Sequence, residues 1–250
     1  MTEKRWNRLS ASELRDLAQR DAVVLLPVGS TEQHGEHLPT GVDDFLAAEV
    51  CRRAAAAATT LPVVVAPSVW CGLAEHHMPF GGTLTLSLQT LHALLRDVCR
   101  SILRSGFRHI LIVNGHGGNV TALNALVNEL TVELGAPIAV TSYFTAGREV
   151  IAETLETQRY LMHACEGETS MMLAAFPALV RAERAAQAVG PAIFLQSEDP
   201  SAVYRSVTFD TITRSGVAGD ARSASAVKGE RLLDGCAKAL ADLLDAGIWS

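Results

Sequence analysis

Short apolar runs rich in β-branched residues alternate along this chain with longer stretches whose apolar residues recur every three or four positions. The short runs predict strands at 22–28, 62–69, 109–113 and 137–143. The longer stretches predict helices near 43–58, 88–105, 119–134, 164–176 and 222–246. This alternation is typical of a mostly parallel sheet covered by helices. We therefore expect an α/β fold, a three-layer sandwich with helices on both faces of the sheet.

Several local signals predict where helices begin and end. Ser10 and Glu13 have the spacing of a capping box that opens a first helix. Gly106 and Gly135 are expected to close the helices before them. Residues 189–220 are rich in turn-forming residues, and either an insertion or a subunit contact would explain them. Because no repeat or linker is evident, we expect one domain over residues 1–250.

Composition restricts the classes of partner. The 250 residues include 21 Lys and Arg against 27 Asp and Glu, a formal net charge of −6. No basic run exceeds Arg52-Arg53, so neither nucleic acid nor an anionic membrane surface is expected as a partner. The five cysteines form no C-x-x-C pair and predict free thiols in a reducing compartment. With no secretory signal or membrane-length apolar stretch predicted, we expect a cytoplasmic protein that acts on a small molecule.

The loop after the first predicted strand carries the first chemical cluster. It offers Glu32, His34, Glu36, His37, Asp43 and Asp44 within a short segment. Zinc and similar divalent metals bind imidazole nitrogen together with carboxylate oxygen, so this loop is a candidate metal site. The alternative is that the two aspartates complement a helix start while the histidines are exposed.

A second cluster, Asn114 to Asn119, follows the strand at 109–113. Its glycines permit a sharp turn and a close approach to a ligand, with His116 between them. Taken alone, the segment could equally be a tight strand-to-helix turn. At the carboxyl end of a parallel strand, however, it would lie beside the first cluster, because binding sites form along that edge.

Two further clusters have functional and purely structural interpretations. In the third, His163 to Met172, the carboxylate of Glu168 adjoins an apolar helix face and would be costly to bury unpaired. A solvated helix start is the other interpretation, and Cys165 is expected to be structural. In the fourth, Glu75 to Thr83, either His76 or His77 could face a pocket, although loop histidines are often simply solvated.

Together, four blocks resemble the creatininase (creatinine amidohydrolase) family in order and spacing: GSTEQHGEHLPTGVD, EHHMPFGGT, VNGHGGN and HACEGETSMM. They span about residues 27–172, with a weaker echo at Ser215 to Asp220 and Ala224 to Gly229. The resemblance implies a mostly parallel α/β fold, divalent metals, commonly two per subunit (zinc, manganese or iron), and hydrolysis of C–N amide bonds. It also implies a homo-oligomer, often a hexamer.

The resemblance also assigns residues. The implied metal ligands are Glu32, His34, Asp43 and His116, with Asp43 bridging two ions and Glu168 as a further acidic position near the metals. His163 falls on a catalytic position and would donate a proton to the leaving nitrogen, while Glu168 would be a ligand or proton acceptor. For substrate binding we expect His76, Gly117 and Gly118. A metal, together with His76 or backbone N–H groups, would hold the oxyanion.

Two departures from creatininases bear on the substrate. This chain has Gly118 where creatininases carry a glutamate that holds the second metal, so either Glu168 completes that site or the site is weaker. Residues 143–163 contain no tryptophan, although creatininases close over substrate with one from this segment. Creatinine itself is therefore not the expected substrate.

The function predicted from sequence is metal-dependent hydrolysis of the C–N amide bond of a small, possibly cyclic substrate by a metal-activated water. One alternative is a deformylase or peptidase that acts on an acyclic amide with the same metals. Another is a non-catalytic module that binds a metal or ligand on this scaffold.

Overall fold

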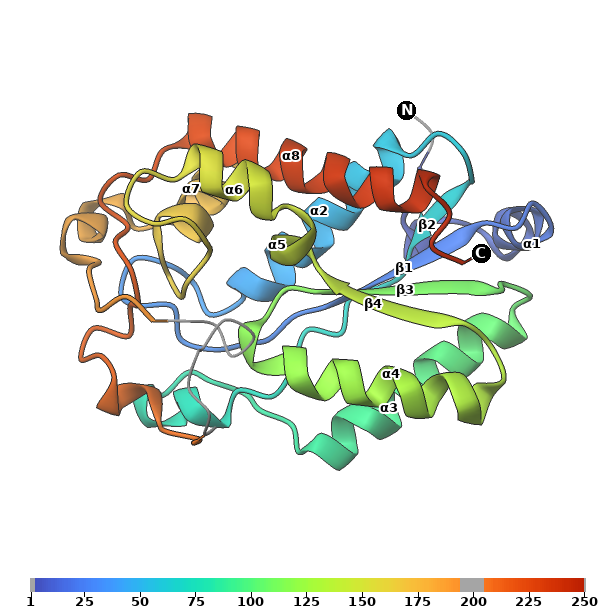
Figure 1. Cartoon of the computed structure of the whole chain (residues 1–250), viewed down its shortest axis with the longest axis horizontal. Helices are drawn as coiled ribbons and strands as arrows, with labels where there is room; N and C mark the ends of the chain where they lie inside the picture. Colours follow the sequence, from blue (N-terminus) through green and yellow to red (C-terminus); the bar gives the residue numbers. More distant parts are fainter. Residues whose placement is uncertain (1–2, 194–204, 250) are drawn as a thin grey trace.

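The computed structural model describes residues 3–193 and 205–249. Its sheet is formed by β1 (Val23–Val28), β2 (Val63–Val65), β3 (His109–Asn114) and β4 (Ile138–Ser142). The strands lie in the order β2-β1-β3-β4, and every ladder is parallel (Figure 1). In the register, Val23 lies opposite both Val63 and His109.

Helices cover both faces of this sheet (Figure 1). One face carries α2 (Val42–Ala57), α5 (Tyr143–Ala146), α6 (Arg148–Thr154), α7 (Glu166–Ala175) and α8 (Ala226–Asp245). The other carries α1 (Ala11–Gln19), α3 (Leu88–Arg104) and α4 (Val120–Leu134). The short 3-10 helices are η1 (Trp6–Arg8), η2 (Glu75–Phe80), η3 (Gly117–Asn119), η4 (Pro177–Leu179), η5 (Ala182–Gln187) and η6 (Phe209–Thr211). The expected α/β sandwich is confirmed.

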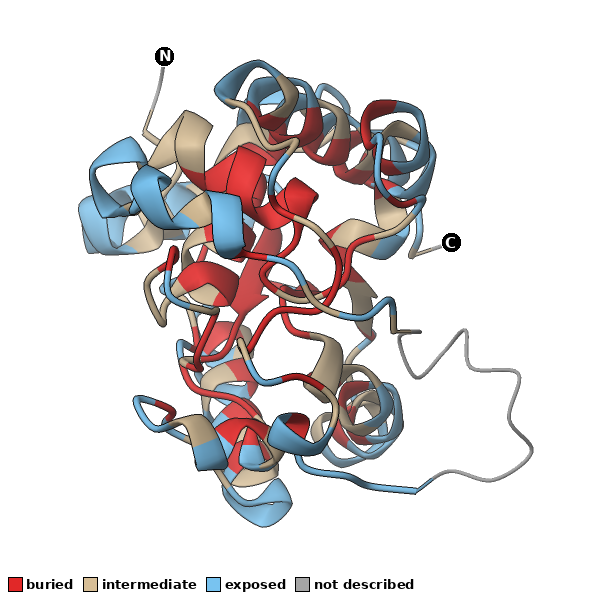
Figure 2. Cartoon of the chain, turned by 90° about the vertical axis from the view of Figure 1, so that its left-hand side faces the viewer, coloured by how far each residue is buried: buried red, intermediate tan, exposed pale blue. Residues whose placement is uncertain are grey.

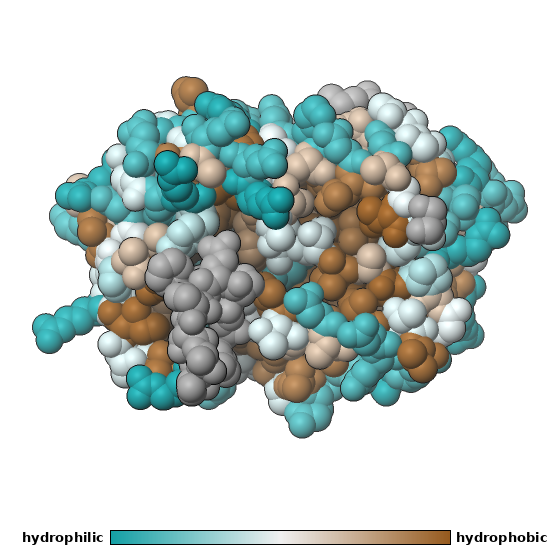
Figure 3. All heavy atoms as spheres, viewed as in Figure 1, coloured by the Kyte–Doolittle hydropathy of each residue, from teal (hydrophilic) through white to brown (hydrophobic). Residues whose placement is uncertain are grey.

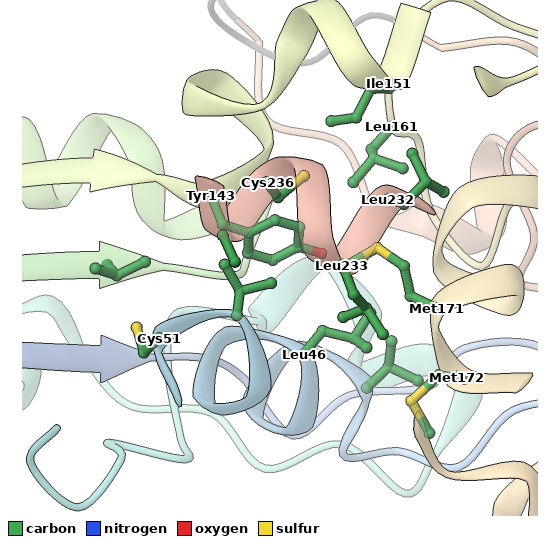
Figure 4. Close-up of a cluster of buried hydrophobic side chains, with 14 of the residues drawn as sticks. Leu46, Cys51, Tyr143, Ile151, Leu161, Met171, Met172, Leu232, Leu233 and Cys236 are labelled. Atoms are coloured by element: carbon green, nitrogen blue, oxygen red, sulfur yellow. The ribbon is translucent and has the colours of Figure 1, made fainter. Parts of the chain in front are cut away.

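Side-chain alternation along the strands divides the core in two. Val23 and Leu25 of β1 pack under α2 and α8, whereas Val24 and Leu26 pack against α3 and α4. All four are fully buried, which explains why β1 appears in the sequence as a continuous apolar run. Figure 4 shows the first of these cores, where Tyr143 lies among aliphatic and sulfur-containing side chains of α2, α7 and α8.

Several predicted boundaries were wrong by a few residues. The strand predicted at 62–69 ends at Val65, because Pro67 cannot donate to a ladder, and pairing resumes only as an isolated bridge at Val69. The helix predicted from 164 begins at Glu166, since Ala164 has a left-handed φ of 54°. The predicted strand end at Tyr143 instead starts α5.

Other local predictions are confirmed. Ser10 accepts from the Glu13 backbone N–H in a complete capping box. Gly135 caps α4 in the left-handed region, with φ of 62°. Of the segment 189–220, the structure describes 189–193 and 205–220, where Val189 bridges to Asp220 and η6 forms. Residues 194–204 lie outside the described residues, and neither explanation of the segment is tested.

The carboxyl ends of the four strands meet at one edge of the sheet. Figure 2 looks onto this edge and shows buried loops gathered at its centre. A different side of the sheet is visible in Figure 3, where apolar side chains occupy the band between α8 and α4. Edge strand β4 lies in that band, with Ala139 and Val140 half-buried. None of the helices formed by residues 3–193 and 205–249 has both the length and the apolar character that a membrane span needs.

Candidate metal and catalytic site

Two glycines bring the loops after β1 and β3 against the start of α2. A Cβ on Gly115 would lie 2.5 Å from the carbonyl oxygen of Asp43, and one on Gly29 would lie 2.5 Å from the Asp44 Cα. Any larger residue would push these segments apart. The contact places Asp43, in the first turn of α2, beside His116, which follows the end of β3.

Glu32, Asp43 and His116 form the centre of the site. Nδ1 of His116 lies 3.0 Å from Oδ2 of Asp43, and its Nε2 lies 3.2 Å from Oε2 of Glu32. All three side chains are buried. Ser30 donates a hydrogen bond to Oε2 of Glu32 at 2.9 Å, which fixes one carboxylate oxygen.

His34 lies behind Asp43, with Nε2 3.1 Å from Oδ1. Its Nδ1 is 3.1 Å from the Glu32 carbonyl oxygen, so the ring is held from both sides. Burial disfavours the charged ring, but Asp43, Glu168 and Glu32 outweigh it and raise the pKa of His34 to about 9. The loop therefore concentrates negative charge strongly enough to favour a cation.

Glu168 in the first turn of α7 and His163 in the segment before this helix reach the same place. The backbone N–H of Ala164 donates to Oε2 of Glu168 at 2.5 Å. Burial, reinforced by Asp43 and Glu32 but opposed by His34, raises the pKa of Glu168 to about 7. Nδ1 of His163 lies 3.4 Å from Oε1 of Glu32, and burial lowers the pKa of His163 well below its usual value.

Both histidines of η2 border the site. The ring of His76 stacks on His116 with centroids 5.7 Å apart. His77 is the more deeply buried of the two. Its Nε2 lies 3.2 Å from Oε1 of Glu32, and its ring stacks on His163 with centroids 4.3 Å apart. Burial and the neighbouring histidines lower the pKa of His77 to about 2, so the ring is neutral. Sequence reasoning chose His76, and adjacency along the chain gave no means of ranking the two.

Sequence reasoning did not identify Gln33 as a residue of the site. Its side chain is buried between His77 and His163. Unlike its neighbours Glu32 and His34, it is uncharged and is not a typical metal ligand. The signal in the sequence was its place inside the block STEQHG, although its partner His163 is 130 residues distant.

Other members of the first cluster take no part in the cavity. His37 is buried, and its Nε2 is 2.9 Å from Oγ1 of Thr169. Glu36 is exposed and pairs with Arg184.

Cys165 of the third cluster is buried, and the low polarity around it raises the pKa of its thiol to about 12, which agrees with a structural role.

The residues present fit divalent metals. Oε1 of Glu32 and Oδ2 of Asp43 are buried and make no hydrogen bond. Two triads have ligand atoms within 4.8 Å of one another, namely Glu32 with His34 and Asp43, and Glu32 with His77 and His163. Carboxylates buried this closely are costly unless a cation neutralises them, and carboxylate with imidazole is a donor set that zinc and manganese accept.

A cavity of about 1090 Å³ opens above this centre. Its acidic and histidine lining comprises Glu32, Asp43, Glu75, His76, His77, His116, His163 and Glu168. The other polar side chains of the lining are Thr85, Ser87, Arg205, Ser206 and Thr208. Its apolar lining comprises Leu73, Met78, Pro79, Leu86, Leu88, Met162, Ile193, Val207, Phe209 and Ile212. Phe209 lies edge-on to His163 at 4.9 Å and covers His77 at 4.4 Å.

Gly117 and Gly118 also line the cavity, at the start of η3. At Gly118 a Cβ would lie 2.7 Å from the Leu73 carbonyl oxygen and 2.8 Å from a ring carbon of His76. The nearest atom to that Cβ would be Nε2 of His116. A side chain at this position, where creatininases carry glutamate, would therefore displace the His116 ring, the Leu73 carbonyl and His76 of η2. Glu168 also lines this cavity.

The site combines carboxylates and histidines at the carboxyl edge of a parallel sheet. Together with the family match of this chain, this arrangement defines a metal-dependent amidohydrolase. The family profile described as creatinine amidohydrolase matches residues 7–244. The chain belongs to the creatininase family.

Named relatives span nearly the whole chain. The mycofactocin precursor peptide peptidase of Mycolicibacterium smegmatis is 34% identical over 92% of this chain and 88% of its own. The creatinine amidohydrolase of Pseudomonas putida is 29% identical over 91% and 90%. A solved manganese creatininase superposes with a TM-score of 0.85 at 28% identity, and a mutant creatininase of the Zn–Zn type with 0.81 at 28%, each covering 100% of both chains.

Proposed function

We propose that this protein hydrolyses the C–N bond of an acyclic amide that carries an apolar group beside the scissile bond. The observation that carries the proposal is the cavity, whose lining combines apolar side chains with carboxylates and histidines. Its volume of about 1090 Å³ greatly exceeds a single five-membered ring. Relatives named as peptide peptidases support an acyclic amide. Ring opening of a small cyclic amide is the second candidate, favoured by the creatinine amidohydrolase relative.

The proposed metal ligands are Glu32, His34, Asp43 and His116, which together would hold two divalent ions. Glu168 would be either a further ligand or the proton acceptor. When bound, such ions polarise an amide carbonyl and lower the pKa of a water molecule to near neutrality. Zinc, manganese and iron all suit this donor set. We also propose one domain over residues 1–250 and a cytoplasmic homo-oligomer, in which a hexamer would follow the habit of the family.

Protein side chains supply the proton transfers. Glu168, with its pKa raised to about 7, is suited to accept the proton of the attacking water and release it again near neutral pH. His163 delivers a proton to the leaving nitrogen. Phe209 and its apolar neighbours exclude bulk water from the reacting carbonyl, which strengthens each charge interaction on the cavity floor.

Metal content and substrate range test the proposal together. Inductively coupled plasma mass spectrometry on purified protein should find near two metals per subunit, and Asp43→Ala should lose most of them. Asp44→Asn is the matched control, because Asp44 is the adjacent carboxylate but does not belong to the cavity lining. One metal per subunit would replace the paired centre by a single ion, and none after reconstitution would overturn the hydrolase mechanism in favour of a binding module.

Activity should then be measured on N-formyl amines, short peptides with apolar residues, creatinine and related cyclic amides. Turnover of the acyclic, apolar members is the expected result. Preference for the cyclic amides would overturn the acyclic assignment and support the second candidate.

A further inference from the structure

The side-chain amide of Gln33 lies between two histidine rings of the site. Its Nε2 is 2.9 Å from Nδ1 of His77 and 3.0 Å from Nε2 of His163. A third neighbour is the carbonyl oxygen of Gly216, also at 3.0 Å. An amide nitrogen has two hydrogens, so the identity of its two acceptors determines the ring protons of both histidines.

Backbone groups fix the orientation of this amide. The N–H of Gly35 donates to Oε1 of Gln33 at 2.9 Å, and Nε2 donates to the Gly216 carbonyl. A backbone N–H can only donate and a carbonyl can only accept, so the oxygen and nitrogen of Gln33 cannot be exchanged. Gly216 has a φ of 73°, and a Cβ there would overlap the Gln33 amide. The fold therefore reserves this space for the amide.

The ring protons follow from this arrangement. One hydrogen of the Gln33 amide goes to Gly216, and the other goes to Nδ1 of His77, which must accept it. The neutral ring of His77 then carries its own proton on Nε2. Nε2 of His163 lies 2.7 Å from the main-chain carbonyl oxygen of Gln33 and donates to it, so Nδ1 of His163 has no proton. The approach of His163 Nε2 to the amide nitrogen is then a contact without a hydrogen bond.

The two rings consequently present opposite groups to the site. Nε2 of His77, an N–H, lies 3.2 Å from Oε1 of Glu32. Nδ1 of His163, a lone pair, lies 3.4 Å from the same oxygen. That oxygen makes no hydrogen bond, so the N–H of His77 is not committed to a protein acceptor. A buried, neutral imidazole N–H that lines a reaction cavity is available to a substrate oxygen.

We propose that His77 is a further catalytic residue, whose Nε2–H binds the amide carbonyl oxygen and the oxyanion that develops on it, and that Gln33 is the positioning residue that keeps this proton on Nε2. The inference rests on the proposed function. It replaces the expectation that His76 performs this role, because His77 is the ring held by the amide.

The proposed step balances in atoms and protons. The water oxygen bonds to the amide carbon, and the carbonyl π pair moves onto the oxygen that His77 holds. The water proton passes to Glu168 and then to Nδ1 of His163, which has no proton at rest. When the oxyanion re-forms the carbonyl, the C–N bond breaks and the nitrogen takes that proton from His163.

Proximity also allows a competing role, because His77 belongs to one of the triads that could hold a metal. Ligation would require a lone pair on Nε2 of His77. A neutral ring that accepts the Gln33 hydrogen at Nδ1 has its proton on Nε2 and cannot ligate there. Metal ligation by His77 and hydrogen-bond donation by His77 therefore predict different nitrogen spectra.

Long-range proton–nitrogen NMR on zinc-loaded protein labelled at histidine nitrogens separates these roles, with each ring assigned by its own histidine variant. We expect Nε2 of His77 to be protonated and Nδ1 to be bare. Gln33→Glu should move the His77 proton to Nδ1, because a carboxylate oxygen there accepts instead of donating. The ring of His163 should keep its Nε2 proton in the same variant, since a main-chain carbonyl holds it. A zinc-shifted, unprotonated Nε2 of His77 would overturn the proposal.

Kinetics supply the second readout. Removing one oxyanion donor usually lowers kcat by about 10²–10³-fold, so His77→Asn should show this loss with KM and metal content little changed. His77→Gln should recover part of kcat, because its amide nitrogen reaches nearer the position of imidazole Nε2. Loss of metal in both variants would show ligation and overturn the donor role.

These experiments distinguish a failure of the proposed function from a failure of the role of His77. If the unmodified protein hydrolyses no amide, the proposed function and the catalytic role of His77 fail together. The NMR spectra would still decide whether Gln33 sets the ring protons. If amides are hydrolysed but His77→Asn keeps its full kcat, the catalytic role of His77 alone is overturned.

Discussion

Lys228 on α8 donates a hydrogen bond from Nζ to Oε1 of Glu166 at 2.5 Å, and so joins the last helix to the first residue of α7. Glu166 is fully buried and also accepts from the backbone and hydroxyl of Thr157 at 2.9 and 2.7 Å. These contacts enclose the segment that carries His163. We therefore expect the position of His163, the proposed proton donor, to depend on an ion pair outside the cavity.

Lys228→Met should destabilise the protein by about 3 kcal/mol, because it leaves a buried carboxylate without its cation. Chemical denaturation followed by circular dichroism measures this difference. Lys238→Met is the control, since the pair of Lys238 with Asp242 is exposed and contributes little. Equal effects in both variants would refute a special role for the buried pair.

The same pair predicts a pH dependence. Burial would raise the pKa of Glu166, but Lys228 and Thr157 outweigh it and hold the pKa below its ordinary 4.5. The pKa of Lys228 lies above its ordinary 10.5, despite partial burial, because Glu166 and Glu156 stabilise the ammonium. The stability lost in Lys228→Met should thus be constant between these two ordinary values. It should shrink as acid protonates Glu166 or as alkali neutralises Lys228 in the unmodified protein.

His163→Ala should lower kcat by about 10²–10⁴-fold, the usual contribution of a positioned proton donor, while metal content remains unchanged. His109→Ala is the matched control, because His109 begins β3 at the opposite edge of the sheet and pairs with Asp21. Steady-state kinetics and metal analysis on both variants decide the matter. Turnover of His163→Ala at the rate of the unmodified protein would contradict the role of His163 as proton donor.

Restoring the glutamate of creatininases at Gly118 should harm this protein. A Cβ there would approach the Leu73 carbonyl oxygen to 2.7 Å, so we expect both Gly118→Ala and Gly118→Glu to cost about 1–3 kcal/mol. Thermal unfolding and metal counts on the two variants separate crowding from the added carboxylate. An unchanged melting temperature with an extra bound metal in Gly118→Glu would contradict the crowding argument.

The five cysteines should resist modification in the native state. All are unpaired and buried, and burial raises the pKa of Cys99 and Cys236 to about 12. Because the thiolate is the reactive form, Ellman's reagent should react slowly with folded protein and release five equivalents in guanidinium. A fast equivalent in native protein would locate a thiol that opens to solvent.

The pattern of apolar residues predicted the fold well, because the fold depends on burial and each buried strand appears in the sequence as an apolar run. The four apolar runs became the four strands, and their following loops supplied Glu32, Asp43 and His116. Glycine spacing did not reveal that Gly118 is crowded by Leu73 and His76, because these residues belong to a distant segment of the chain.

The sequence pattern could not predict contacts between residues that lie far apart along the chain. Gln33 is an uncharged amide whose role appears only when His77 and Gly216 approach it from other parts of the chain. Phe209 covers the histidines from a segment with weak periodicity, so it could not be distinguished from other loop aromatics. His77 and His76 are neighbours, and only the turn of η2 decides which ring goes inward.

The dependence of α7 on α8 has a consequence for how the centre is made in the cell. A nascent chain synthesised as far as Glu168 already contains every proposed ligand, but α7 still lacks Lys228 and the apolar face of α8, including Leu232, Leu233 and Leu240. We therefore expect the ligands to converge only after translation has passed α8. Metal loading is then a late, post-translational event, and a truncated chain that contains all the ligands should still fail to retain its ions.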